Sequence, residues 1–192
     1  MSTNCECASN IPNFCLLQGK AFGDTPKDKD GAIEVYTYCI NETKKCLSFT
    51  ENPVSKEKLC KQIAIGYNER GFMKYQKVDF DSAIADYSKA LSYDASLYFT
   101  FYNRGLIHYR LGRFNEAIAD MKEALSLHPD FEPAKQCLAQ ANIDKSRPKH
   151  TDTFNATSSQ NIDSESSLPG TQRMPEPISK EEKTQESHKD AS

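Results

Sequence analysis

Small and large apolar residues alternate with helical spacing over much of this chain, and the arrangement in residues 64–97 returns in residues 98–131. The small members correspond at one constant displacement: Gly71, Ala83 and Ala90 match Gly105, Ala117 and Ala124. The large members follow the same period, with Tyr67, Phe80 and Leu91 matching Phe101, Phe114 and Leu125. A period shared by so many positions indicates two consecutive copies of one structural unit.

Each copy is predicted to be a pair of antiparallel helices joined by a short turn. Small residues let the two helices approach to the close end of the usual separation of about 8–10 Å, and the large residues fill the remaining space. The turns are expected at residues 77–79 and 111–113. His128 and Pro129 end the second pair, because proline cannot continue a helix interior and restrains the residue before it.

Charged residues within the two copies are expected to serve packing or solubility. Arg70 and Arg104 directly precede the two packing glycines, so we expect each to pack or pair within its own unit. Glu116, Asp120 and Glu123 are expected to be solvated charges on the outer helix.

The pattern is weaker before residue 57. Residues 1–13 are expected to form a flexible arm, and residues 14–49 predict a degenerate first unit with its second helix over Ala32–Ile40. The first helix of this unit would include Phe14–Phe22. Here Lys20 stands where the packing glycine is expected, and the turn Gly23–Gly31 is lengthened. Terminal units of stacked repeats are often atypical, because one face must meet water.

A connector over residues 50–56 separates this unit from the clear copies. Ser55 is the predicted N-cap of a long helix through Tyr75, so the second unit covers residues 57–97 with an extended first helix. The third unit covers residues 98–131. Four apolar residues then follow at i, i+3, i+4 and i+7, which predicts an amphipathic capping helix over residues 132–146: Ala134, Cys137, Leu138 and Ala141.

The composition changes after this helix. Nearly all of the apolar residues of the chain lie within residues 1–146, whereas residues 147–192 are rich in Ser, Thr, Gln, Glu, Lys and Pro. The tail cannot bury enough apolar area to offset about 1–2 kcal/mol of backbone entropy per residue, so residues 147–192 are predicted to be disordered.

The two clear copies resemble the tetratricopeptide repeat (TPR) family. The resemblance covers Ala64–Leu97 and Tyr98–Phe131, and Tyr67 and Phe101 stand where the family often has tryptophan, a residue that this chain lacks. It implies an all-α fold, in which antiparallel helix pairs stack into a short right-handed superhelix with a capping helix and a disordered tail. It also implies a concave face, lined by the first helix of each pair, that binds peptides.

The family's groove positions can be transferred to this sequence one by one. They mix aromatic, aliphatic, amide and cationic side chains: Ile65, Asn68, Phe72, Tyr75 and Gln76 in the second unit, and Phe99, Tyr102, Leu106, Tyr109 and Arg110 in the third. We call these ten residues the groove positions. Aromatic residues and arginine dominate binding hot spots, but aromatic residues at helical spacing also serve as core, and both interpretations remain open here.

Some members of the family bind the acidic C-termini of Hsp70 and Hsp90 through a clamp of Lys, Asn and Arg side chains. The clamp has Lys and Asn in the first repeat, Asn in the second, and Lys and Arg in the third. The matching positions here hold Leu17 and Ala21, then Glu69, then Phe99 and Asn103, so no clamp residue is retained at its position. Because Glu69 would repel a terminal carboxylate, the sequence argues against Hsp70 or Hsp90 as carboxylate-clamp partners.

Charge and motifs exclude several other function classes. The formal net charge of −3 and the isoelectric point near 5.8 favour neither nucleic acid nor an anionic membrane as a partner. No run of residues approaches the roughly 18–20 apolar residues that span a bilayer, and the N-terminus has no secretory signal pattern. We therefore expect an intracellular protein of the cytoplasm, with the nucleus left open. No catalytic motif is present, so we expect neither an enzyme nor a cofactor.

Seven cysteines leave one alternative open. No pair has the spacing of a zinc site, and the odd, scattered set does not indicate a disulfide framework. A thiol-metal or redox role could use Cys5, Cys7 and Cys15. A self-associating scaffold is a second alternative, because short repeat arrays can stack end to end. The interpretation that the sequence favours is a monomeric, non-enzymatic adaptor that binds a peptide segment of another protein.

Overall fold

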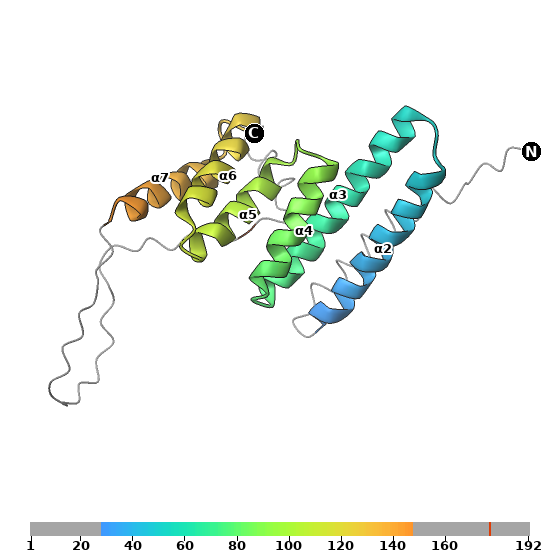
Figure 1. Cartoon of the computed structure of the whole chain (residues 1–192), viewed down its shortest axis with the longest axis horizontal. Helices are drawn as coiled ribbons and strands as arrows, with labels where there is room; N and C mark the ends of the chain where they lie inside the picture. The colour runs from blue at the N-terminus through green and yellow to red at the C-terminus, as the bar shows by residue number, and fades with distance from the viewer. Residues whose placement is uncertain (1–27, 148–176, 178–192) are drawn as a thin grey trace, which may run out of the picture.

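The computed structural model describes residues 28–147 and residue 177, and within this part of the chain it contains only helices and their connections (Figure 1). The helices are α2 (Lys29–Phe49), α3 (Pro53–Gln76), α4 (Phe80–Tyr93), α5 (Tyr98–Arg110), α6 (Phe114–Leu127) and α7 (Glu132–Ser146). The predicted all-α helical repeat is therefore confirmed. The N-terminal arm, the helix over Phe14–Phe22 and nearly all of the predicted tail lie outside the described residues.

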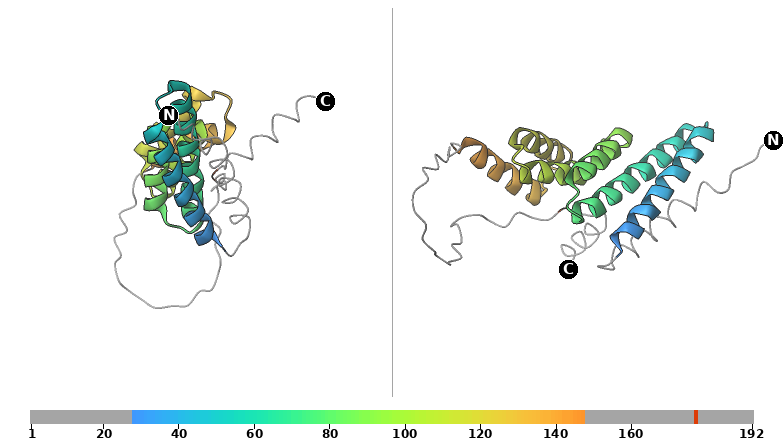
Figure 2. Two further views of the ribbon diagram at one scale, coloured as in Figure 1. Left: turned by 90° about the vertical axis from the view of Figure 1, so that its right-hand side faces the viewer. Right: turned by 60° about the horizontal axis from the view of Figure 1, so that its bottom comes forward.

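Consecutive helices lie side by side and run in opposite directions, as Figure 1 and the right view of Figure 2 show. Helices α3 and α4 form one pair and α5 and α6 the next, while α2 packs on α3 and α7 packs on α6. The contact between α4 and α5 joins the two pairs. The result is a stack in which the first helix of each pair, α3 and α5, belongs to the same layer.

The two helix starts on the N-terminal side differ from the predictions. Helix α2 begins at Lys29 with Asp28 as its N-cap, whose carboxylate accepts a hydrogen bond from the Gly31 backbone N–H at 2.8 Å. Gly31 therefore belongs to the first turn of the helix and not to the lengthened turn. Asp28 and Asp30 also place negative charge at the N-terminus of the helix, where the helix dipole stabilises it.

Helix α3 begins before the predicted cap at Ser55. Its N-cap is Asn52, whose side-chain oxygen accepts hydrogen bonds from the backbone N–H groups of Val54 and Ser55 at 2.9 and 3.3 Å. Pro53 follows directly, and proline is favoured at the first helical position because it lacks the N–H that would otherwise need a partner. The connector is correspondingly shorter than residues 50–56.

The small residues of the repeat lie where paired helices come closest. Ala83, Ala90, Ala117 and Ala124 have no exposed area. A Cβ atom on Gly105 would lie 2.8 Å from Met121 Cε and 2.9 Å from Asp120 Cβ, and one on Gly71 would lie 3.0 Å from the Tyr87 ring. The backbones of α3 and α5 thus contact the side chains of their partner helices directly.

The large residues of the repeat surround these contacts. Tyr67 is buried, and its ring stacks on Tyr93 at 6.0 Å between centroids. Phe80, Phe101 and Phe114 are half-buried at the ends of the helix pairs. Phe80 meets the Tyr75 ring at 5.8 Å, and Phe114 meets the Tyr109 ring at the same separation.

The turns inside the two pairs have the same backbone geometry but different residues. Val78 has φ of 64° and Gly112 has φ of 71°, and the two residues occupy equivalent positions of the repeat. Glycine adopts this left-handed conformation without steric cost, whereas a β-branched residue does not.

Candidate interaction surface on α3 and α5

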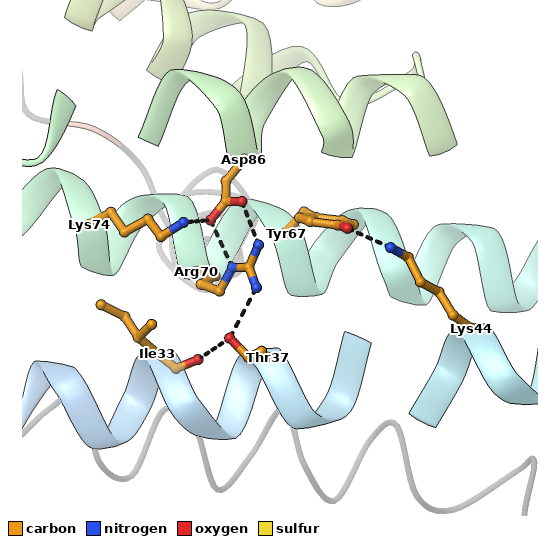
Figure 3. A network of polar contacts seen from close by, with 7 residues as sticks. All are labelled: Ile33, Thr37, Lys44, Tyr67, Arg70, Lys74 and Asp86. Atoms are coloured by element: carbon orange, nitrogen blue, oxygen red, sulfur yellow. Dashed lines mark hydrogen bonds and ion pairs between the residues drawn. The ribbon is translucent and has the colours of Figure 1, made fainter. Parts of the chain in front are cut away.

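Arg70 is the centre of a polar network that joins α2, α3 and α4 (Figure 3). Its guanidinium donates to both carboxylate oxygens of Asp86, at 2.8 and 2.6 Å, and to the Thr37 hydroxyl at 3.0 Å. Lys74 adds an ion pair to the same carboxylate at 2.7 Å. The hydrogen bonds to Asp86 raise the pKa of Arg70 despite its partial burial.

The next pair repeats this arrangement. Arg104 donates to both oxygens of Asp120, at 3.0 and 2.7 Å, and to the Ser88 hydroxyl at 3.0 Å. The expectation that the two arginines pair within the repeat is met in both cases. The expectation that Asp120 is a solvated charge is wrong, because its carboxylate is buried against the helix that carries Arg104. Glu116 and Glu123 are exposed, as expected.

One groove position, Asn68, lies buried at the junction of α3 and α5. Asn68 is fully buried on α3, where its side-chain oxygen accepts a hydrogen bond from the Thr100 hydroxyl at 2.9 Å. Its amide donates to the Glu69 carboxylate at 3.1 Å, and Glu69 is itself buried. Sequence reasoning missed this buried polar chain, because neither Thr100 nor Glu69 stands at a position where the apolar period signals burial.

At their C-terminal ends the two helices meet through Tyr75 and Arg110. The Arg110 guanidinium lies 5.3 Å from the centroid of the Tyr75 ring, within the range of a cation–π interaction. Tyr75 is 7% exposed and packs with Ala83, Tyr87 and Ile107, whereas Arg110 is exposed. This contact brings a groove position of the second unit directly against one of the third.

Three groove positions of α5 instead pack toward α7 or α6. Tyr102 has no exposed area, and its ring meets Phe131 edge-on at 5.1 Å. Leu106 is equally buried in the same cluster, with Met121 and Ala124. The structure therefore places Tyr102 and Leu106 in the core. Of the two interpretations that the sequence leaves open for the groove positions, core packing therefore applies to these two, because helix α7 covers the end of the repeat.

Tyr109 is partly buried and donates a hydrogen bond to the Asp144 carboxylate of α7 at 2.6 Å. Burial and this hydrogen bond raise the pKa of the Tyr109 hydroxyl well above its usual range. In return, the hydrogen bonds from Tyr109 and Gln140 lower the pKa of Asp144. Tyr109 thus fixes the capping helix.

The other four groove positions differ in exposure. Ile65 and Gln76 are partly exposed on α3, and the Gln76 backbone carbonyl accepts a hydrogen bond from the Lys29 ammonium at 3.2 Å. Phe72 is half-buried and packs on the cluster around Tyr36 of α2. Phe99 is 5% exposed, and its ring meets Tyr98 edge-on at 5.9 Å. Among the ten groove positions, Arg110 is thus exposed, and Ile65, Phe72, Gln76 and Tyr109 are partly exposed.

The described residues contain no group of three or more His, Cys, Asp or Glu side chains arranged to hold a metal ion. Cys39, Cys46, Cys60 and Cys137 form no disulfide bond with one another. Burial raises the pKa of Cys137 to about 12, which suppresses its thiolate. The residues of the thiol-metal alternative, Cys5, Cys7 and Cys15, lie outside the described part of the chain. None of the described helices has the length and apolarity to cross a membrane.

Comparisons with known proteins agree with this architecture. Residues 98–131, which form α5, α6 and the turn after them, match the family model described as Tetratricopeptide repeat. No curated protein gives a significant match.

Three solved structures share the fold. The TPR domain of Arabidopsis OM64 is 24% identical, with a TM-score of 0.55 over 69% of this chain and 95% of that one. A TPR2B-domain:pHsp70 complex of yeast Sti1 is 19% identical, with a TM-score of 0.55 over 69% and 97% of the two chains. The C-terminal TPR-containing domain of a Plasmodium falciparum protein described as an FK506-binding protein is 16% identical, with a TM-score of 0.57 over 70% and 88%. The chain therefore has the TPR fold, and TPR domains are generally protein–protein interaction modules.

Proposed function

We propose that this chain is a non-enzymatic adaptor that binds a peptide segment of another protein on the inner layer formed by α3 and α5. The observation that carries the proposal is the contact of Arg110 with Tyr75. It places an exposed cation on an aromatic ring at the point where two repeat units meet. Arginine and tyrosine are among the residue types most enriched in binding hot spots.

The neighbouring side chains support recognition of an extended peptide. Ile65 and Gln76 lie partly exposed on the same helix as Tyr75, and offer one apolar and one amide contact. An extended segment presents alternate side chains, so a surface with separated apolar, amide and cationic positions can fix its register. Asn68, which is fully buried, would act by holding α3 against α5 through Thr100.

The chemistry of the partner differs from that of an acidic C-terminus. The Sti1 domain mentioned above was solved as a complex with pHsp70. In this chain the clamp positions Glu69, Phe99 and Asn103 are all buried, and none is a lysine or arginine. We therefore propose a peptide with an apolar or aromatic anchor and an acidic residue beside it.

Three finer assignments belong to the same proposal. The stretch from Gly66 to Gly112 is similar to tetratricopeptide repeat protein 32, and we propose that the chain is related to that protein. We also propose a cytoplasmic site of action, where the chain acts as a monomer.

Proximity labelling with the full-length chain tests the adaptor function. The variant Arg110→Glu should lose the labelled partners of the wild type by about tenfold or more, because it reverses an exposed charge at the junction. Lys122→Glu is the matched control, since it makes the same charge change on an exposed position of α6. Both variants should retain wild-type helicity by circular dichroism.

Two outcomes of the labelling experiment would contradict the proposal. Unchanged labelling by a folded Arg110→Glu variant, or equal loss in Lys122→Glu, would move the binding site away from α3 and α5. Alanine variants of Tyr102 and Tyr109 are unsuited to this test, because both side chains hold α7.

A further inference from the structure

The end of the α2–α3 pair protrudes from the rest of the stack. Helix α3 has 24 residues, whereas its partner α4 has 14. Because Tyr67 of α3 stacks on Tyr93, the last residue of α4, the first part of α3 extends beyond the end of α4. Figure 1 shows this part at the upper right, where it lies against the end of α2. We call residues 44–61, which include the connection between the two helices, the α2–α3 tip.

Two bulky apolar side chains are exposed on this tip. Phe49, the last residue of α2, is 86% exposed, and Val54, in the first turn of α3, is 76% exposed. They are the two most exposed large apolar side chains among the described residues. A single exposed apolar residue is common on protein surfaces, whereas two that share one protruding end indicate contact with a partner.

Each of these apolar residues has lysine on the same face of its helix. On α2, Lys45 lies four residues before Phe49. On α3, Lys58 and Lys61 lie four and seven residues after Val54. Residues at these spacings share one face of an α-helix. The nearest lysine on each helix is therefore about 6 Å further from the end of the tip than the apolar residue.

The tip is basic although the chain is acidic. Residues 44–61 contain five lysines and two glutamates, whereas the formal net charge of the whole chain is −3. Four of the five lysines are exposed, and Lys44 is held by the fold because it donates to the Tyr67 hydroxyl at 2.6 Å. The sequence argument against an anionic membrane rests on the net charge, which does not reveal this local excess of cations.

The exposed lysines can contact an external anion at little cost to the fold. Lys45 pairs with Glu42 at 2.6 Å, and Lys61 pairs with Glu57 at 2.7 Å, each within its own helix. The two lysine side chains are 68% and 54% exposed. Exposed pairs of this kind contribute little to stability, so a lysine can exchange its carboxylate for another anion.

We propose that the α2–α3 tip docks on an anionic lipid membrane, with Phe49 and Val54 inserted among the headgroups and the lysines against the lipid phosphates. Apolar side chains of membrane-surface proteins reach about 5–10 Å into the boundary between headgroups and acyl chains. Lysines about 6 Å behind the inserted residues therefore lie at the level of the phosphates, and their long stems let the ammonium groups stay in water. Basic clusters of this kind are attracted to the anionic lipids of the cytoplasmic leaflet.

A lipid surface fits this tip better than a protein partner does. A standard protein–protein interface buries about 800 Å² on each side, which two side chains at a convex end do not supply. A bilayer interface is deformable and surrounds such an end on all sides. The docking is independent of the peptide surface proposed above, because Tyr75 and its contact with Arg110 lie at the other end of α3. The two sites can therefore be occupied together.

Co-sedimentation of the full-length chain with vesicles tests the proposal. The chain should bind vesicles of phosphatidylcholine with about 30% phosphatidylserine about tenfold or more tighter than vesicles of phosphatidylcholine alone. The double variant Phe49→Ser/Val54→Ser should bind the mixed vesicles about tenfold or more weaker, because it removes both inserted side chains. Lys58→Glu/Lys61→Glu should lose about as much, and added salt should weaken binding by the wild type.

Matched variants elsewhere on the chain serve as controls. Val78→Ser removes an apolar side chain that is 69% exposed in the turn at the opposite end of α3. Lys89→Glu/Lys122→Glu reverses two exposed lysines on α4 and α6. Both variants should bind the mixed vesicles as the wild type does. Circular dichroism should show wild-type helicity in every variant, because all of the substituted side chains are exposed.

Insertion itself can be measured with a single fluorophore, because the chain has no tryptophan. In Phe49→Trp, the emission should shift to shorter wavelength when the mixed vesicles are added, since the indole leaves water. Val78→Trp should show no shift, because its position lies at the other end of α3.

Three outcomes overturn the proposal. They are absence of binding to the mixed vesicles, equal loss of binding in the control variants, and wild-type binding by Phe49→Ser/Val54→Ser. The two proposals fail separately. If vesicle binding is absent while Arg110→Glu still loses its labelled partners, the adaptor function stands and membrane docking is refuted. If Phe49→Ser/Val54→Ser loses labelled partners although the wild type binds no vesicles, the tip binds a protein and membrane docking is likewise refuted.

Discussion

Arg104 binds both oxygens of the Asp120 carboxylate, at 3.0 and 2.7 Å, and Arg70 binds Asp86 in the same manner one repeat earlier. In each case the arginine precedes the glycine at which the two helices touch, and the aspartate lies on the partner helix. The fork of the guanidinium matches a carboxylate, which a lysine cannot do. The ion pair thus fixes the relative position of the two helices at their closest point.

The first prediction concerns this pair. Arg104→Met should reduce the free energy of unfolding by about 2–3 kcal/mol, because it leaves the buried Asp120 carboxylate without its charged donor. Urea unfolding followed by circular dichroism measures the change. Arg113→Met, at an exposed turn position, is the control and should change stability by less than about 0.5 kcal/mol.

A double-mutant cycle isolates the interaction itself. Combining Arg104→Met with Asp120→Leu should recover part of the lost stability, since no charge is then buried without its partner. Strictly additive losses in the double variant would show that Arg104 and Asp120 are not energetically coupled.

The second prediction concerns the left-handed turn positions. Val78→Gly should increase the free energy of unfolding by about 1 kcal/mol, because Val78 is an exposed β-branched residue at φ of 64°. The reciprocal change Gly112→Val should lower stability by a similar amount, although nothing lies within 4 Å of the added Cβ. Thermal unfolding of both variants provides the measurement. If both changes shift the melting temperature in the same direction, backbone strain is not what distinguishes these turns.

The third prediction concerns the packing seams. Ala83→Leu and Ala117→Leu should each cost about 1–3 kcal/mol, because both positions have no exposed area at a close helix contact. Ala85→Leu and Ala119→Leu are the matched controls, two residues further along the same helices and exposed. Chemical denaturation should separate the two pairs. Equal stability of all four variants would contradict the register of the repeat.

The fold could be predicted from the helical spacing of apolar residues and from their repetition along the sequence. The constant displacement that relates Ala83 to Ala117 predicts two equivalent helix pairs, and both alanines lie buried at equivalent seams. The start of α3 was misplaced because Ser55 and Asn52 are both good caps. The structure uses Asn52, since Pro53 directly after it fits the first helical position.

The candidate surface was harder to predict, for a physical reason. Groove positions follow from the repeat only where another unit continues the stack. Tyr102 stands at a groove position, but helix α7 ends the stack there and its flanking residue Phe131 covers the ring. Asp120 is a similar case. Its carboxylate is buried next to the Arg104 guanidinium, which belongs to another helix. The apolar period along one helix therefore predicts neither the contact of Tyr102 with Phe131 nor that of Asp120 with Arg104.

The last prediction concerns His108, which lies half-buried on α5 at 4.0 Å from Asp120. Burial lowers the pKa of its imidazole, and this outweighs the attraction of the Asp120 carboxylate; Arg104 acts in the same direction as burial. Its Nδ1 atom has no hydrogen-bond partner among the described residues, so protonation there would gain nothing. The folded protein therefore holds His108 neutral below the pH at which the unfolded chain becomes protonated.

The sign of the pH effect follows from this difference. Below about pH 6.5, the usual pKa of histidine, the unfolded chain binds a proton that the folded chain resists, so stability should fall as the pH decreases from 7 toward 5. Above that value His108 is neutral in both states and contributes no slope. His108→Gln should make the dependence shallower, whereas Asn115→Gln, at an exposed position of α6, should leave it as in the wild type. Urea midpoints measured at half-unit pH intervals test this, and an unchanged slope in His108→Gln would show that the imidazole is not held neutral by the fold.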